Sequence, residues 1–336
     1  MADGGDTLRV FERGTYDLLQ PVDIEGFRAH NRTKPKALVD KRMTEQEAVA
    51  RFLQDDIYLG IELYGTVRCP MSIVREMIRQ IRARGIQNLR IAGQGCYEQE
   101  LLVNTGAIKA SDWTYTGLEV YGISPSWRRA VEGGVVEKVC EWSNAALAWR
   151  FKAAGMGVPF LPVQVMMGTD TLRCSSAMVV ENPYGEGKVA LVPALIVDLG
   201  VIHVHRADRY GNCQIDGIAG FAREMARASR RLIVSAEEIV DTEEIRRHPD
   251  RTAIPYFLVD AVVEAPYGSH PGEMAGLYER DEPHIKGYYA DAKDAERARG
   301  YMDTWIYDVP DHAAYLDKVT ADRLAALRLD GGCLLY

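Results

Sequence analysis

Hydrophobic and polar positions alternate along the chain with periods that predict amphipathic helices and buried strands in turn. The first helical pattern, TEQEAVARFL, opens at Thr44 with Glu47 three residues later, which is the spacing of a capping box. A short apolar run at 57–60 then predicts a buried strand, and a glycine-bearing loop over 60–70 follows it. The next pattern, MSIVREMIRQIRARG, predicts an amphipathic helix that ends at Gly85.

The segment NLRIAGQG, which ends at Gly95, predicts a second strand and another glycine loop, so that strand, loop, helix and strand form a βαβ unit. Such a unit requires parallel strands and a right-handed connection. Further strands are predicted at Pro159–Met167, Val189–Val192, Leu195–His205, Arg231–Ser235 and Leu258–Glu264. Further helices are predicted at Pro125–Glu132, Ser143–Ala154, Gly220–Ala228, Glu237–Arg247 and Tyr315–Leu327. The predicted fold class is α/β with a mostly parallel central sheet, whose ligand would sit at the carboxyl ends of the strands.

The residue pattern changes at Thr44, and it predicts an N-terminal extension, residues 1–42, and one large domain, residues 43–336, although no sharp shift in composition marks the boundary. The extension is polar and irregular, with basic residues near its end. Two interpretations stay open for it: an arm that lies on a partner, or a frayed terminus. No internal repeat or low-complexity linker interrupts the remainder.

The amino-acid composition limits which ligands and partners the protein can be expected to bind. The chain has 336 residues, of which 47% are hydrophobic and 26% charged, and its formal net charge is -8. An acidic chain disfavours binding to nucleic-acid phosphates, although a local arginine or helix N-terminus can still hold an anionic ligand. Six irregularly spaced cysteines indicate free thiols in a reducing compartment, and neither a signal peptide nor a membrane-length apolar stretch is visible. We therefore expect a cytoplasmic protein with no nucleic-acid or membrane partner.

The loop GIELYGTVRCP supplies the first candidate residues. Gly60 would let backbone N–H groups approach a ligand, and Arg68 would pair with a carboxylate or phosphate. Glu62 stands in an apolar stretch, where loss of hydration would raise the pKa of its carboxyl. The alternative is an ordinary turn between strand and helix, with Glu62 in solvent.

The segment GQGCYEQE supplies the second set. It resembles half of a dinucleotide-binding fingerprint, but the third glycine is absent. Gln94 and the amide of Gly95 would instead donate hydrogen bonds to a thioester oxygen, as in an oxyanion hole. The alternative is a tight turn, with Glu98 and Glu100 in the first turn of a helix, where acids are favourable.

Other motifs carry less chemistry. His203 and His205 lie two apart on a predicted strand and so share a face, but no third metal ligand has matching spacing and no metal site is expected. Ser143 is better explained as a helix N-cap than as a nucleophile, since no GxSxG elbow is present. Three aromatic residues could line a pocket, although at such spacing they more often belong to the core: Trp113, Tyr115 and Tyr121.

Several long, collinear segments resemble the A-type chain of glutaconate CoA-transferase, within the family I CoA-transferases. They cover roughly residues 42–330 and include GVPFLPVQVMMG, NPYGEGKVALVP, SAEEIVDTEEIRRHPD and VDAVVEAPYGSHP. The resemblance implies the CoA-transferase fold and a homologous B subunit, in an α2β2 assembly. It also implies coenzyme A as a substrate rather than a permanently bound cofactor, with a small carboxylic acid as the second substrate.

The resemblance implies that the nucleophilic glutamate lies on the B subunit, and that the A-type chain contributes a Gly-Gly loop with Arg and Pro after it. Gly60, Arg68 and Pro70 match this loop, but Ile61-Glu62 replaces the second glycine and the residue after it. A related branch instead opens a ring hydrolytically in CoA-linked intermediates of steroid breakdown. In such a hydrolase, an acidic residue of the A-type chain would suit the role of general base. The candidates are Glu62, Glu98 and Glu141. A third possibility is a non-catalytic subunit that binds CoA esters.

Overall fold

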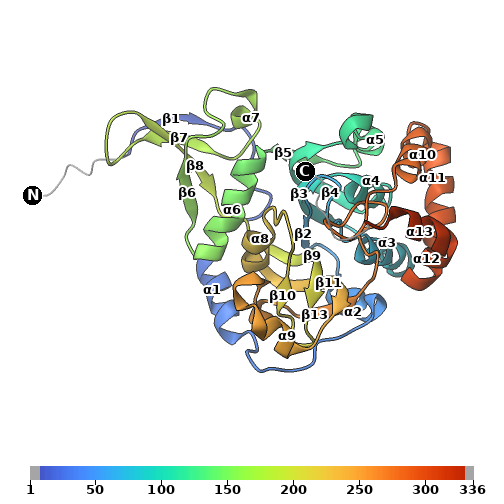
Figure 1. Ribbon diagram of the computed structural model, residues 1–336. Helices are drawn as coiled ribbons and strands as arrows, with labels where there is room; N and C mark the ends of the chain where they lie inside the picture. The colour runs from blue at the N-terminus through green and yellow to red at the C-terminus, as the bar shows by residue number, and fades with distance from the viewer. Residues whose placement is uncertain (1–7, 330–336) are drawn as a thin grey trace, which may run out of the picture.

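The computed structural model describes residues 8–329, which fold around one large sheet with a smaller sheet at one end (Figure 1). The strands are β1 Val10–Arg13, β2 Tyr58–Glu62, β3 Leu89–Gly95, β4 Ile108–Thr116, β5 Lys138–Glu141, β6 Phe160–Val163, β7 Met178–Glu181, β8 Lys188–Pro193, β9 Val197–Ala207, β10 Cys213–Gln214, β11 Ser229–Ile239, β12 Thr252–Ile254 and β13 Ala261–Glu264. The helices are α1 Ile24–Thr33, α2 Glu45–Phe52, α3 Met71–Arg84, α4 Tyr97–Val103, α5 Pro125–Glu132, α6 Asn144–Met156, α7 Asp170–Arg173, α8 Ala222–Ala228, α9 Thr242–Arg247, α10 Glu282–Ala292, α11 Ala295–Met302, α12 His312–Val319 and α13 Ala321–Leu327.

The large sheet is mostly parallel, as the sequence predicted. Its nine strands include the path β12-β10-β9-β2-β3-β4-β5, with β11 pairing β9 and β13. All pairs from β13 through β11, β9, β2, β3 and β4 to β5 are parallel, and only the short β10 and β12 pair antiparallel. The carboxyl ends of β2, β3 and β4 therefore meet at one edge of the sheet.

Both faces of the large sheet are buried. Along β2, Leu59 and Ile61 point into one core cluster, which includes residues of α2, α3 and α4. Tyr58 belongs to the other cluster, which includes residues of α1, α6 and α8. This alternation places helices on the two sides of the sheet, the arrangement of a doubly covered α/β fold.

The small sheet has four antiparallel strands in the order β1-β7-β8-β6, and the sequence patterns did not predict it as a separate sheet. In Figure 1 it lies at the opposite end of the molecule from α10–α13. Its strand β1 comes from the N-terminal segment, and Phe27 of α1 is buried in the core beside α6 and α8. Residues 8–42 thus pack on their own chain, and whether they also contact a partner stays a prediction.

Several predicted boundaries were wrong. Residues 237–239 do not begin a helix: they continue β11, because Glu238 and Ile239 pair with Arg206 and Ala207 of β9, and α9 begins only after its N-cap Asp241. The strand predicted over 159–167 ends at Val163. The expected loop over 60–70 is shorter, since β2 runs through residue 62.

The C-terminal helices α10–α13 pack beside α3 and α4 (Figure 1). A buried polar cluster joins them: the Arg75 guanidinium lies 3.5 Å from the ring centroid of Tyr315, whose hydroxyl is 2.7 Å from His270 Nδ1. Tyr97, the first residue of α4, is hydrogen-bonded to Tyr301 of α11. These contacts join α12 to α3 and α11 to α4. Across residues 8–329, no helix combines the length and apolar character that a bilayer crossing requires.

Candidate active site at the carboxyl ends of β2, β3 and β4

The structure brings most of the predicted site residues to one edge of the large sheet. Gly60 and Glu62 lie in β2, Gln94 and Gly95 end β3, and Glu98 lies in α4 directly after β3. Arg68 comes from the loop between β2 and α3 and reaches back to the same edge. The two glycine loops predicted from the sequence are therefore neighbours in space.

Glu62 and Arg68 form a fully buried ion pair. Arg68 Nη1 and Nη2 donate to the two carboxylate oxygens of Glu62 at 2.9 and 3.0 Å, and both side chains are 0% exposed. The same guanidinium donates to the backbone carbonyls of Ile218 and His203. Burial raises the pKa of Glu62 while the Arg68 charge opposes this, so the expected upward direction is confirmed. The alternative of a solvated Glu62 is wrong, and Arg68 already has its carboxylate partner within the chain.

Gly60 is needed for packing inside the molecule. A Cβ atom at this position would lie 2.9 Å from Met225 Sδ and 3.1 Å from a methyl group of Val197. A larger residue would make the side chains of Met225 and Val197 shift, so glycine favours the close packing of β2 against α8 and β9. Gly60 lies within the buried strand β2 and not in the loop after it, and its role beside a ligand stays a prediction.

Glu98 is a buried acid without a cationic partner among its hydrogen bonds. Its side chain is 0% exposed, and both carboxyl oxygens accept from the backbone N–H of Cys96 at 3.2 Å. Burial raises the pKa of Glu98 to about 8, and these backbone donors oppose the rise only in part. At neutral pH the group is therefore mostly protonated, which suits a proton donor and not an anionic nucleophile.

Gly95 lies in a crowded turn beside Glu98. A Cβ there would come within 2.9 Å of Gln99 Oε1 and 3.3 Å of Thr116 Oγ1, so glycine is required for close approach. The Gly95 carbonyl accepts from the backbone N–H of Gly117 at 3.2 Å. Gln94 is partly exposed at the end of β3. Their role as donors to a thioester oxygen stays a prediction.

The remaining acids differ in role. Glu100 accepts hydrogen bonds from the hydroxyl of Ser124 and, at 2.9 Å, from the backbone N–H of Ser126, so it anchors the start of α5. Glu141 is the last residue of β5, paired in register with Trp113 of β4, and is partly exposed. It therefore lies at the same edge as Glu98, but beyond β4.

Sequence reasoning missed several residues of this edge. Gln99 Oε1 and Thr116 Oγ1 are buried without a hydrogen-bond partner among the described residues. Cys69 is also buried there, and burial raises the pKa of its thiol well above the ordinary value, so it is a poor nucleophile. Cys69 lies between Arg68 and Pro70, which both match the loop of the family, and this position could have marked it as a site residue. No local sequence feature distinguished Gln99 or Thr116.

The histidine pair is engaged by the protein itself. His203 lies between Ser235 Oγ and Glu237 Oε1, each 2.8 Å from a ring nitrogen. His205 is held by the Ala275 carbonyl at 2.8 Å and by the backbone N–H of Asp216 at 3.1 Å. Within residues 8–329, no group of three His, Cys, Asp or Glu side chains is arranged to hold a metal ion. The described cysteines are free thiols, and Cys333 lies outside the described residues.

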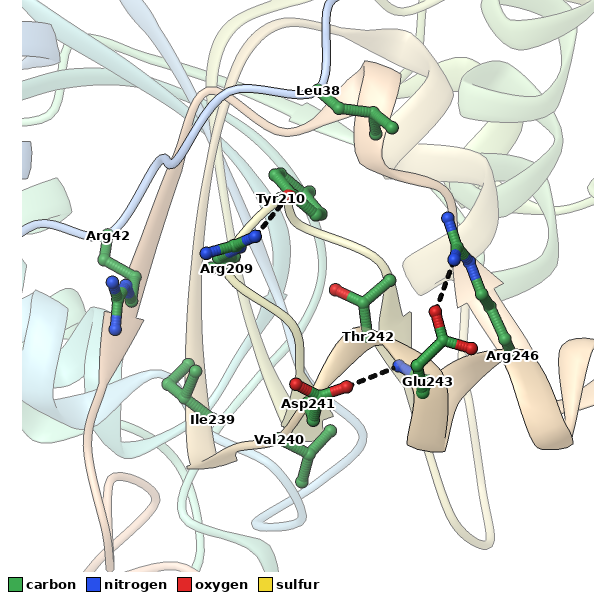
Figure 2. Close-up of a pocket in the computed structure, with 10 residues that line it drawn as sticks. All are labelled: Leu38, Arg42, Arg209, Tyr210, Ile239, Val240, Asp241, Thr242, Glu243 and Arg246. Carbon is green, nitrogen blue, oxygen red and sulfur yellow. Dashed lines mark hydrogen bonds and ion pairs between the residues drawn. The ribbon is translucent and has the colours of Figure 1, made fainter.

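A separate cavity of about 590 Å³ lies beyond the carboxyl ends of β9 and β11, and Figure 2 shows the residues around it. Three arginines line it, and each already has a protein partner. Arg246 is 2.5 Å from Glu243, Arg42 pairs with Asp40 outside the cavity, and Arg209 donates to the hydroxyl of the neighbouring Tyr210 at 2.6 Å. Two of these arginines are therefore in ion pairs, and Arg209 is hydrogen-bonded to a neutral hydroxyl.

The sequence of the chain is similar to those of several known proteins. The family model described as "Coenzyme A transferase" matches residues 42–265. An uncharacterized protein of Archaeoglobus fulgidus is 45% identical over 327 residues, which are 96% of this chain and 72% of that protein. The A-type chain of glutaconate CoA-transferase from Acidaminococcus fermentans is 32% identical over 313 residues, 88% of this chain and 96% of that one. The cholesterol ring-cleaving hydrolase IpdA subunit of Mycobacterium tuberculosis is 30% identical over 268 residues, 76% and 89% of the two chains.

The three-dimensional comparison agrees with these alignments. The crystal structure of the A. fermentans glutaconate CoA-transferase matches with a TM-score of 0.82, covering 88% of this chain and 97% of that one. The likeness therefore extends over both sheets and not only over a shared motif. The chain belongs to the coenzyme A transferase family.

Proposed function

We propose that this chain is the A-type half of a two-subunit enzyme that moves coenzyme A between an acyl-CoA thioester and a carboxylic acid. The observation that carries the proposal is the likeness to the A-type chain of glutaconate CoA-transferase along nearly the whole length of that chain. The partner is a homologous B subunit, in an α2β2 assembly. Coenzyme A enters and leaves as substrate, and no permanently bound cofactor takes part.

The chemistry of the edge supports a nucleophile on the partner. A carboxylate that attacks a thioester must be ionised and free to reach the carbonyl carbon. Glu62 is held on both oxygens by Arg68, and Glu98 is mostly protonated at neutral pH. Neither suits that role, which supports the B-subunit nucleophile that the likeness to glutaconate CoA-transferase implies.

This chain then supplies the surroundings of the reacting thioester. Gln94 and the Gly95 amide stand at the end of β3, where a donor would stabilise negative charge on the thioester oxygen. Arg68 and Gly60 act as positioning residues, because the ion pair and the close packing fix the loop that follows β2.

Borohydride trapping tests the proposal. The chain, co-purified with its B-type partner, is incubated with acyl-CoA and treated with sodium borohydride, which reduces an enzyme-bound glutamyl-CoA thioester. We expect loss of transfer activity together with a reduced glutamate found by mass spectrometry on the B subunit. A reduced glutamate on this chain, or exchange of CoA between acids without any trapped thioester, would contradict the assignment.

A second candidate function is hydrolytic ring opening of a CoA-linked cyclic dione. The observation that favours it is Glu98, whose raised pKa makes it a suitable general acid or base near neutral pH. The likeness to the IpdA subunit is consistent with it. Such an enzyme would consume its CoA ester with water alone, so product formation without an acceptor acid would select this function over CoA transfer.

A further inference from the structure

An apolar groove lies between the carboxyl end of β4 and helix α5. Its walls are the rings of Trp113 and Trp127, whose centroids are 5.7 Å apart in an edge-to-face arrangement, and the side chains of Ile123 and Val131. The groove encloses about 210 Å³. Pockets that hold a whole drug-sized ligand enclose roughly 300–1,000 Å³, so this one has room for only part of such a molecule.

The groove begins beside the candidate active site. Thr116 lines it, and the Thr116 hydroxyl lies 3.3 Å from the position that a Cβ atom at Gly95 would take. Ser124 lines it too and is hydrogen-bonded to Glu100 of α4. A group bound in the groove would therefore extend from the end of β3, where the thioester donors are proposed.

The polar atoms of the groove are few and suit an uncharged ligand. Trp127 is 2% exposed, and its indole Nε1 is buried without a hydrogen-bond partner among the described residues. The two charged residues at the rim, Arg128 and Glu132, lie 3.8 Å apart and offset each other. The lining as a whole therefore carries no net charge, and its one cation, Arg128, lies at the exposed rim beside Glu132.

We propose that this groove binds the acyl group of the CoA ester, and that the preferred acyl group is apolar rather than dicarboxylic. The inference rests on the proposed function and specifies its substrate class. Burying a carboxylate against two indole rings and two aliphatic side chains without a counter-charge is unfavourable, whereas an aliphatic or aromatic chain gains from the same surroundings.

Acyl-CoA esters of equal chain length test the inference. The chain in complex with its B-type partner is titrated calorimetrically with pentanoyl-CoA and glutaryl-CoA, and their kcat/KM values are measured alongside. We expect glutaryl-CoA to bind more than about tenfold more weakly, because its terminal carboxylate loses hydration. From butanoyl- to pentanoyl- to hexanoyl-CoA, each added methylene should tighten binding about fourfold.

A variant of the groove provides the matched comparison. Ile123→Arg should weaken pentanoyl-CoA binding and improve glutaryl-CoA binding, since it places a cation on the wall of the groove, and Ile123 is 66% exposed, so the fold tolerates the change. Val120→Arg is the control, because Val120 is 79% exposed on the same segment and does not line the groove. The control should keep the wild-type order of affinities.

The outcomes separate the two proposals. Equal affinity for both esters, or a preference for glutaryl-CoA, overturns the groove assignment, and turnover of either ester by transfer would still support the proposed function. The expected affinities without turnover of any ester would support the groove and contradict the transferase. If Ile123→Arg leaves the affinities unchanged and instead weakens assembly with the B subunit, the groove is a docking surface for protein and the inference is wrong.

Discussion

At the scale of single residues, the protonation of Glu98 is the property that distinguishes this edge. The ordinary pKa of a glutamate is 4.5, and burial raises that of Glu98 to about 8. Between these values the unfolded chain releases a proton that the folded chain keeps. The contribution of Glu98 to stability is therefore complete below pH 4.5 and is lost as the pH rises toward about 8.

Glu98→Gln should remove this pH dependence. The free energy of unfolding of the wild type should fall by up to about 1.4 kcal/mol per pH unit through the window, relative to the variant. Urea unfolding at steps from about pH 5 to about pH 8 measures the difference. Glu47→Gln is the control, because the Thr44 hydrogen bonds lower the pKa of Glu47 and its difference from wild type should stay constant over the same range. A constant difference for Glu98→Gln as well would mean that Glu98 is ionised in the folded protein.

At the scale of elements, the N-terminal segment is part of the core. Asp23 caps α1 by accepting from the Gly26 N–H at 2.8 Å, and the helix buries Phe27 to 1% exposure against the core cluster of α6 and α8. Strand β1 adds to the small sheet by pairing with β7. The sequence pattern separates this segment from the domain, but burial of its apolar side chains joins the segment to the domain core.

Phe27→Ala should lower the free energy of unfolding of the chain by about 3–5 kcal/mol, because it leaves a cavity in a close-packed core. Denaturant unfolding of the chain without its partner measures the loss. Leu38→Ala is the control in the same segment, since Leu38 is 52% exposed and should change stability by no more than about 0.5 kcal/mol. A small effect of Phe27→Ala would restore the interpretation of residues 1–42 as a separable extension.

At the scale of the whole molecule, the candidate edge has the features that the proposed two-subunit enzyme requires. Two fully buried acids of the edge are neutralised, Glu62 by its ion pair and Glu98 by its proton. Two tyrosine rings at the same edge are exposed, Tyr64 at 48% and Tyr115 at 38%, which leaves apolar surface for another chain to cover.

The chain alone should therefore bind CoA esters without exchanging CoA between acids, and addition of the B-type partner should restore exchange. Initial rates of thioester exchange for the two separate chains and for their mixture measure this. Exchange by this chain alone at the rate of the mixture would show that the nucleophile lies here after all.

The local features were readable from the sequence because their interactions span only a few residues. The capping box of Thr44 and Glu47 forms as predicted, and α3 ends at Gly85, whose φ of 67° favours glycine. The parallel sheet followed from the βαβ pattern for a different reason, because a crossover helix between two strands makes them run in the same direction.

Other features were decided only by the tertiary structure, because they depend on contacts between residues that are far apart in the sequence. Arg68 donates to the carbonyls of Ile218 and His203, which are distant in the sequence. Strand β11 continues because it pairs with β9, and Glu98 is protonated because other elements bury it. Periodicity tells which side of an element is buried, but it does not tell what lies opposite. The partner of a buried charge, and the pKa that results, are therefore set by packing between elements rather than by the order of residues within one.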